Sequence, residues 1–187
     1  MRRLLSYALT ATAVAGLLAG CGSDSPATKT AAQPPQAGGS YPSQGIAFTP
    51  PSGWSVDRGQ GSLVATVQAG PSTVAVWRYK RGEALPSSKA ELKAARDALL
   101  GAARKHDSTF SEIKTAPTTI AGQPAVQIRA RETIAGQKRT VRSTHIYSHG
   151  AEIVIDAYSD ADSFRKVDAD VFRPLLRSLK ISNPRSA

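Results

Sequence analysis

Apolar and polar residues alternate with a period of two through much of the chain between residues 63 and 158, which is the pattern of strands with one buried face. The runs 63–67 and 73–79 are separated by a segment rich in turn-forming residues and predict a β-hairpin. Further strands are predicted over 110–114, 125–134, 139–148 and 152–158. Short connections containing Gly join the last three of these, so we expect an antiparallel meander.

The period changes to that of a helix in two places. Ser88, with Glu91 three residues later, resembles a capping box, and the apolar spacing that follows predicts a helix running to about His106. A second helical region begins near Asp160, and Pro174 inside it predicts a break or a fresh start. The order of hairpin, helix, meander and helix indicates an α+β fold: a mostly antiparallel sheet with one internal and one C-terminal helix.

The first twenty residues have the pattern of a secretion signal. A basic start is followed by an apolar stretch shorter than the ~20 residues of a stable transmembrane helix. The segment Leu18-Ala19-Gly20-Cys21 resembles the bacterial lipobox position by position. This resemblance implies acylation of the Cys21 thiol with diacylglycerol, cleavage before Cys21 and retention on the extracytoplasmic face of the cell membrane. More than one acyl chain is needed because a single chain anchors only marginally. General secretion and the twin-arginine route both stay open.

Composition divides the rest of the chain. Residues 21–44 carry the cysteine and then a stretch rich in Ser, Pro, Gly and Ala, which predicts a flexible tether because it has almost no large apolar side chains to bury. Residues 45–182 have the length and apolar content of one domain, and 183–187 form a tail. We therefore expect a signal peptide over 1–20, a lipidated tether and a single folded domain.

Charge and cysteine content narrow the classes of partner and site. The formal net charge is +10, and it is +8 without residues 1–20. In an exported protein this suits anionic lipid or wall polymer rather than nucleic acid, with an ordinary solvated surface as the alternative. Cys21 is the only cysteine, which excludes an intramolecular disulfide and a cysteine-based metal site within one chain.

One pair of predicted strands gathers basic residues. If these strands pair antiparallel, they place several cations on one face of the sheet and offer a site for an anionic ligand. The alternative is that neighbouring carboxylates neutralise them. The candidate ligand residues are Arg129, Arg131, Arg139 and Arg142, and the candidate neutralising carboxylates are Glu132, Glu152 and Asp156.

Residue types suited to catalysis occur without a recognisable catalytic motif. Ser143, Ser148, His145 and Asp156 supply the types that a serine hydrolase needs, but no Gly-x-Ser-x-Gly turn is present. His145 and His149 are four residues apart and lie ~13 Å from each other on a strand, too far to share a metal ion. Phosphate, dinucleotide and calcium loops are also absent from the sequence. We expect no enzyme activity, no cofactor and no metal site.

Three stretches together resemble the PsbP-like fold, named for a photosystem II subunit and shared by Mog-type proteins and many bacterial lipoproteins. They are the segment Ile46–Trp54, the turn Ile120–Ala125 and the ending Phe172–Ile181. With the lipobox, they are most similar to the LpqN-type lipoproteins of actinobacteria. The resemblance implies an α/β/α sandwich and a binding or adaptor role, and it carries over no catalytic residues.

These observations lead to one main hypothesis and two alternatives. The main hypothesis is a non-catalytic, membrane-anchored envelope lipoprotein that binds an envelope lipid, another amphipathic ligand or a membrane protein partner. The alternatives are an exported serine-type hydrolase and a purely structural assembly subunit. The residues leave the oligomeric state open.

Overall fold

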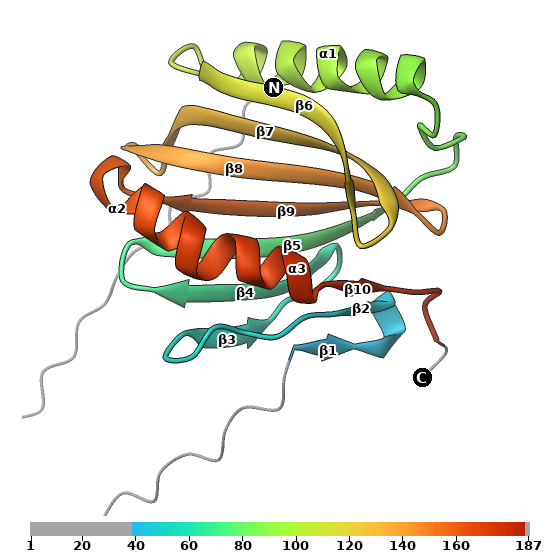
Figure 1. The fold of residues 1–187 in the computed structure, drawn as a ribbon, viewed down its shortest axis with the longest axis horizontal. Coiled ribbons are helices and arrows are strands. Elements are labelled where there is room, and N and C mark those ends of the chain that lie inside the picture. Colours follow the sequence, from blue (N-terminus) through green and yellow to red (C-terminus); the bar gives the residue numbers. More distant parts are fainter. Residues whose placement is uncertain (1–38, 186–187) are drawn as a thin grey trace, which may run out of the picture. The chain divides into compact units, whose positions relative to one another are not determined.

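The fold is described by a computed structural model over residues 39–185 (Figure 1). The predicted signal peptide, the lipobox with Cys21 and most of the tether lie outside the described residues. Within residues 39–185, no helix is both long and apolar enough to cross a membrane.

A seven-stranded antiparallel sheet forms the centre of the domain. In spatial order its strands are β3 (Ser55–Arg58), β4 (Leu63–Ala69), β5 (Ser72–Lys80), β9 (Ala151–Ser159), β8 (Gln137–Ser148), β7 (Gln123–Ile134) and β6 (Ser111–Ile120). The hairpin β4–β5 and the meander β7–β9 confirm the pairing predicted from the alternating pattern, and β6 adds a further strand beside β7. Pairing of β5 with β9 joins the two parts into one sheet.

A small second sheet closes one end of the domain. It consists of β1 (Ser40–Tyr41), β2 (Ile46–Ala47) and β10 (Lys180–Ile181), with the short helix η1 (Pro42–Gln44) between the first two. The pairing of β2 with β10 brings the beginning and the end of the domain together.

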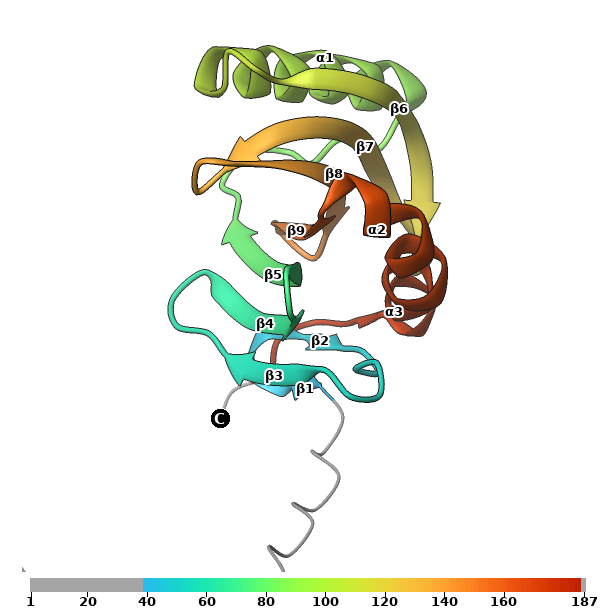
Figure 2. The same cartoon turned by 90° about the vertical axis from the view of Figure 1, so that its left-hand side faces the viewer.

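The helices lie on opposite faces of the large sheet (Figure 2). Helix α1 (Lys89–His106) begins at the predicted capping box, in which the Ser88 hydroxyl accepts from the Glu91 amide. The second region consists of α2 (Ala161–Val167), a π-helical turn η2 (Asp168–Phe172) and α3 (Arg173–Ser178). The expected interruption before Pro174 therefore takes the form of a wide turn, which places the proline in the first turn of α3, where its missing N–H costs no helical hydrogen bond.

Each face of the sheet has its own core. On the α2–α3 face, apolar residues of β4, β5 and β9 pack against the helical segment, with Phe172, Ile155 and Leu175 among the most buried. On the α1 face, a smaller cluster joins Leu92 and Leu100 to residues of β7. Alternate residues of a strand point to opposite faces, so β7 and β8 contribute residues to both clusters. This arrangement is the predicted α+β fold with two helical layers.

Three tight hairpin turns of the meander use the same local chemistry. Each turn has an Xaa-Gly pair with both residues at positive φ, as type I′ turns require. The pairs are Ala121-Gly122, Ala135-Gly136 and His149-Gly150. Gly122, at φ 75°, thus has the turn role that the sequence predicted, while the three residues before the glycines adopt a conformation that is strained for a side chain with a Cβ.

The tether boundary predicted at residue 44 is too late by a few residues. Tyr41 is only 5% exposed and stacks on Phe48, and Gly39 accepts a hydrogen bond from the amide of Phe48. Composition concealed this because a single aromatic side chain within a Gly- and Pro-rich stretch is enough to attach it to the core. Trp54 packs edge-on against Phe172 with ring centroids 6.4 Å apart.

Candidate functional site

The predicted basic residues divide between the two faces of the sheet. Arg129 and Arg131 on β7 share the α2–α3 face with Arg142, because Arg129 and Arg142 are directly opposite in the strand register. Arg139 belongs to the alternate series of β8 positions, which faces the other side of the sheet. It lies opposite Glu132, and its guanidinium donates to Asp160. The structure therefore brings three of the four candidates together.

A basic groove lies between β6, β7 and β8 on the α2–α3 face, and its volume is about 300 Å³. We use this name for the hollow lined by Lys114, Ala116, Pro117, Thr118, Gln127, Arg129 and Arg142. Lys114 is opposite Arg129 on one side and Arg142 is opposite it on the other, so three cations form a row across neighbouring strands. Like charges in directly opposed positions repel one another, so this row costs free energy unless anions lie close by.

Only one cation of this row is neutralised within residues 39–185. Arg142 donates from Nε and Nη2 to the two carboxylate oxygens of Asp168, at 2.6 Å and 2.8 Å. Burial works to raise the pKa of Asp168, but the hydrogen bonds and charges of Arg142 and Arg173 outweigh it and hold that pKa below its usual range. Arg142 is thus held by a carboxylate that comes from η2, not by any of the three carboxylates considered from the sequence.

Arg129 and Lys114 have no carboxylate within ion-pair distance among residues 39–185. The Arg129 guanidinium lies 5.3 Å from the centre of the Phe164 ring, and its Nε is buried without a hydrogen-bond partner. A cation over an aromatic face is held in place without losing its charge. Arg129 is therefore positioned, still charged and open to an additional acceptor.

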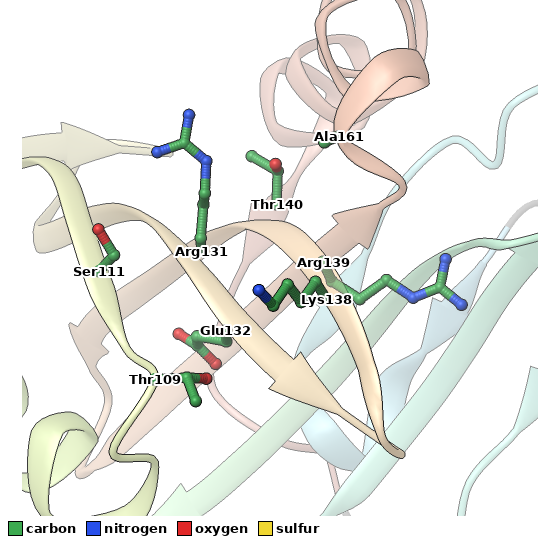
Figure 3. Close-up of a pocket in the computed structure, with 8 residues that line it drawn as sticks. All are labelled: Thr109, Ser111, Arg131, Glu132, Lys138, Arg139, Thr140 and Ala161. Atoms are coloured by element: carbon green, nitrogen blue, oxygen red, sulfur yellow. The ribbon is translucent and has the colours of Figure 1, made fainter.

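Arg131 continues the basic surface into a second hollow of about 310 Å³ near the start of α2. Figure 3 shows its guanidinium pointing away from that of Arg139, on the other side of the hollow, while Glu132 lies beside Thr109. Burial, together with the charges of Asp156 and Asp107, raises the pKa of Glu132. This hollow contains charges of both signs, so the basic groove is the better place for an anion.

The serine and histidine residues form a hydrogen-bonded chain on the opposite, α1 face. Ser143 Oγ lies 3.0 Å from His145 Nε2, and His145 Nδ1 lies 2.7 Å from Glu152 Oε1. Burial opposes ionisation of Glu152, but hydrogen bonds from His145 and Arg81 hold its pKa below the usual range. The carboxylate beside the histidine is Glu152, whereas Asp156, the residue considered from the sequence, accepts from Ser143 Oγ at 2.5 Å.

This chain contains a hydroxyl, an imidazole and a carboxylate, but Ser143 Oγ donates its only proton to Asp156, so His145 is not positioned as its general base, and other parts of a hydrolase are also missing here. Ser143 is in the middle of β8, between two paired strands, so the amides around it serve the sheet ladders and do not form an oxyanion hole. Ser148 points elsewhere and donates to Gln123 Oε1. In the β8–β9 hairpin Glu152 lies opposite Tyr147, which places it diagonally across from His145. Counting this register from the His149-Gly150 turn could have predicted the contact from the sequence.

The described residues also offer no metal centre: between residues 39 and 185, no three His, Cys, Asp or Glu side chains gather closely enough to hold an ion. His149 is in the turn after β8, whereas His145 lies within that strand.

Comparison with solved structures gives matches at low sequence identity. The cyanobacterial PsbP protein of Synechocystis is 14% identical, with a TM-score of 0.56 over 74% of this chain and 88% of that protein. LpqN of Mycobacterium tuberculosis, described as involved in cell envelope biogenesis, is 16% identical, with a TM-score of 0.54 over 73% of this chain and 83% of LpqN. A Pseudomonas aeruginosa protein of unknown function is 14% identical, with a TM-score of 0.50 over 77% and 85% of the two chains.

No protein-family model and no curated protein sequence matches the chain. The structural matches show that the chain has the PsbP-like fold, including its LpqN-type form, as its sequence motifs predicted. Proteins of one fold carry many different functions, so the function has to be argued from the surfaces described above.

Proposed function

We propose, from this PsbP-like fold and its basic groove, that the protein is an exported, lipid-anchored envelope protein that binds the anionic head group of an envelope lipid without catalysing a reaction. The observation that carries the proposal is the row of Lys114, Arg129 and Arg142, in which only Arg142 has a carboxylate partner among residues 39–185. An anion in the groove relieves the repulsion within this row.

The surroundings of the groove favour a head group that is attached to apolar chains. Ala116 and Pro117 line the groove beside Lys114 and Arg129, so apolar and cationic surfaces adjoin. Each basic residue near an anionic leaflet contributes about 1 kcal/mol of attraction. The lipobox-like segment ending at Cys21 and the involvement of LpqN in cell envelope biogenesis support a membrane setting.

Vesicle flotation tests the head-group proposal directly. We expect the full chain carrying Cys21→Ser, which removes the acylation site, to float with phosphatidylglycerol vesicles and not with phosphatidylcholine vesicles. The variant Lys114→Gln/Arg129→Gln/Arg131→Gln removes three positive charges and should lose most of this binding. The matched control Lys89→Gln/Lys105→Gln/Arg177→Gln removes the same charge from exposed helical positions and should retain it.

Two results would contradict the head-group proposal. Equal loss in both triple variants would show that net charge, not the groove, drives binding. Binding to both vesicle types would show that no anion is recognised. Crosslinking in cells that captures one dominant protein neighbour, with no vesicle binding, would favour the assembly-subunit alternative instead.

Anchoring is tested separately. We expect Cys21→Ala to release the protein from the membrane fraction in a detergent-partition assay, because the acyl chains supply the stable part of the attachment. Unchanged partition of Cys21→Ala would refute a lipid anchor and would leave the groove proposal intact.

An exported serine-type hydrolase is the second candidate function, favoured by the hydrogen-bonded chain Ser143–His145–Glu152. It predicts turnover of activated esters that disappears in His145→Ala. Absence of turnover by the wild-type protein, or turnover that survives the substitution, would eliminate this candidate.

A further inference from the structure

Arg78 on β5 is the most buried arginine of the described residues, with 6% of its surface exposed. Alternation along β5 places it on the α2–α3 face, after the core residues Val74 and Val76 and directly opposite Ile153 of β9. Its position therefore belongs to the inward-pointing series that an apolar residue normally occupies.

The hydrogen bonding of this guanidinium is incomplete. Nη2 donates to the backbone carbonyl of His149 at 3.1 Å, whereas Nη1 is buried and has no partner. No carboxylate lies within ion-pair distance of Arg78 in the part of the chain that the structure describes. Burial accordingly lowers the pKa of Arg78, and no neighbouring charge offsets this effect.

The contrast with Arg142 shows what is missing. Arg142 is 8% exposed, nearly as buried as Arg78, and it holds both carboxylate oxygens of Asp168. A buried charge is costly unless it is paired, so buried arginines normally have an anionic partner. Arg78 is in the same situation without such a partner.

Arg78 borders a hollow of about 400 Å³ that contains further donors. Lys80 lies two residues further along β5, and Ser62 comes from the turn before β4. Gln44, from the end of η1, completes the polar lining. The hollow thus offers two positive charges, a hydroxyl and an amide, contributed by three separate segments of the chain.

We infer that this hollow binds a phosphate group, with Arg78 Nη1 and Lys80 as its charged ligands and Ser62 and Gln44 as neutral donors. A carboxylate is best bound by two parallel N–H groups of one guanidinium. Arg78 has committed one N–H of Nη2 to His149, so its Nη1–Nη2 fork is partly occupied, and both N–H groups of Nη1 remain for a ligand. Donors that approach from different segments suit the four oxygens of a tetrahedral phosphate better than the two coplanar oxygens of a carboxylate.

Calorimetric titration of the full chain carrying Cys21→Ser with inorganic phosphate tests the inference, with acetate at equal ionic strength as the comparison. We expect saturable phosphate binding that is weakened at least about tenfold by Arg78→Met, because the variant lacks a charge-assisted hydrogen bond to the phosphate. Arg78→Met should also raise the thermal midpoint without phosphate, because it removes a buried, unpaired charge. Lys80→Gln changes an exposed side chain and should weaken phosphate binding even if Arg78→Met fails to fold.

Arg177→Met serves as the matched control, since it removes one exposed arginine from α3 and leaves both the Arg78 hollow and the basic groove unchanged. Phosphate binding that is absent, equal to acetate binding, or unaffected by Lys80→Gln overturns the inference. Loss of phosphate binding in Arg129→Met alone would assign the phosphate to the basic groove and would also overturn it. Failure of the vesicle experiment has no bearing on this result, because the two sites share no residue.

Discussion

The carboxylate of Asp168 forms an ion pair between the helical segment α2–η2–α3 and Arg142 of the sheet. Its side chain is 2% exposed and that of Arg142 is 10% exposed. Asp168 accepts two hydrogen bonds from Arg142 and a third from Arg173 Nε at 2.9 Å. Asp168→Asn keeps the shape of the side chain and removes its charge, so Arg142 is left buried without a counterion.

We expect Asp168→Asn to lower the free energy of unfolding by about 3–5 kcal/mol, the usual cost of breaking a buried ion pair from one side. Most of the cost arises from the uncompensated Arg142, since Arg173 is 54% exposed and water can solvate it. Replacing both partners, as Asp168→Leu/Arg142→Met, should recover most of the loss, because apolar residues of similar volume leave no buried charge.

Urea unfolding at pH 7, followed by tryptophan fluorescence, measures this loss, because one of the two tryptophans, Trp54, packs against Phe172 of η2. The control Asp170→Asn breaks an exposed pair with Lys166 and should leave the unfolding midpoint unchanged. A loss below about 1 kcal/mol for Asp168→Asn, or a double variant as unstable as the single one, would refute the reasoning.

The same pair has a defined pH dependence. The pKa of Asp168 is depressed in the folded protein, so its stabilising contribution is complete above the unfolded pKa of about 3.9 and is lost as the pH falls toward the folded value. The stability difference between wild type and Asp168→Asn should therefore be constant above about pH 5 and shrink in stronger acid. A difference that grows on acidification would contradict this sign.

The remaining predictions concern local features. Ser88→Ala removes the capping hydroxyl of α1 and should cost about 1 kcal/mol in urea unfolding, whereas an unchanged midpoint would mean that α1 does not depend on its cap. Ala135→Asn places a residue that tolerates positive φ in the β7–β8 turn and should stabilise the protein by about 0.5 kcal/mol in the same assay; destabilisation would show that the turn geometry is different. Burial, reinforced by the charge of Glu152, raises the pKa of Tyr147 to about 12, so its contribution to stability is present below the unfolded pKa of about 10 and is lost as the pH rises toward 12. The variant Tyr147→Phe should therefore lose less unfolding free energy than the wild type between about pH 10 and pH 12, measured by urea unfolding at each pH. Identical alkaline profiles of the two proteins would refute this prediction.

The alternating pattern determined most of the local structure. It predicted the β4–β5 hairpin, the meander and the start of α1, because side-chain periodicity and turn residues act over short distances in the chain. It did not reveal the small sheet formed by β1, β2 and β10, since two-residue strands have no period. Nor did it reveal the pairing of β5 with β9, which joins segments separated by about seventy residues.

The candidate sites depended more strongly on the tertiary structure. The sequence placed Arg129, Arg131 and Arg142 on neighbouring strands, but the register decided that they share a face and that Arg139 does not. Only the packing of η2 against β8 brings Asp168 to Arg142 and leaves Arg129 charged. The burial of Arg78 likewise arises from an inward strand position, not from any motif.

Hydrophobic periodicity and turn chemistry are properties of neighbouring residues, so the sequence alone determined the hairpin, the meander and the two helical regions of this protein. The tertiary structure decided which arginines are buried and which have a carboxylate partner. Both properties depend on side chains that are distant in the chain and meet only in the folded domain.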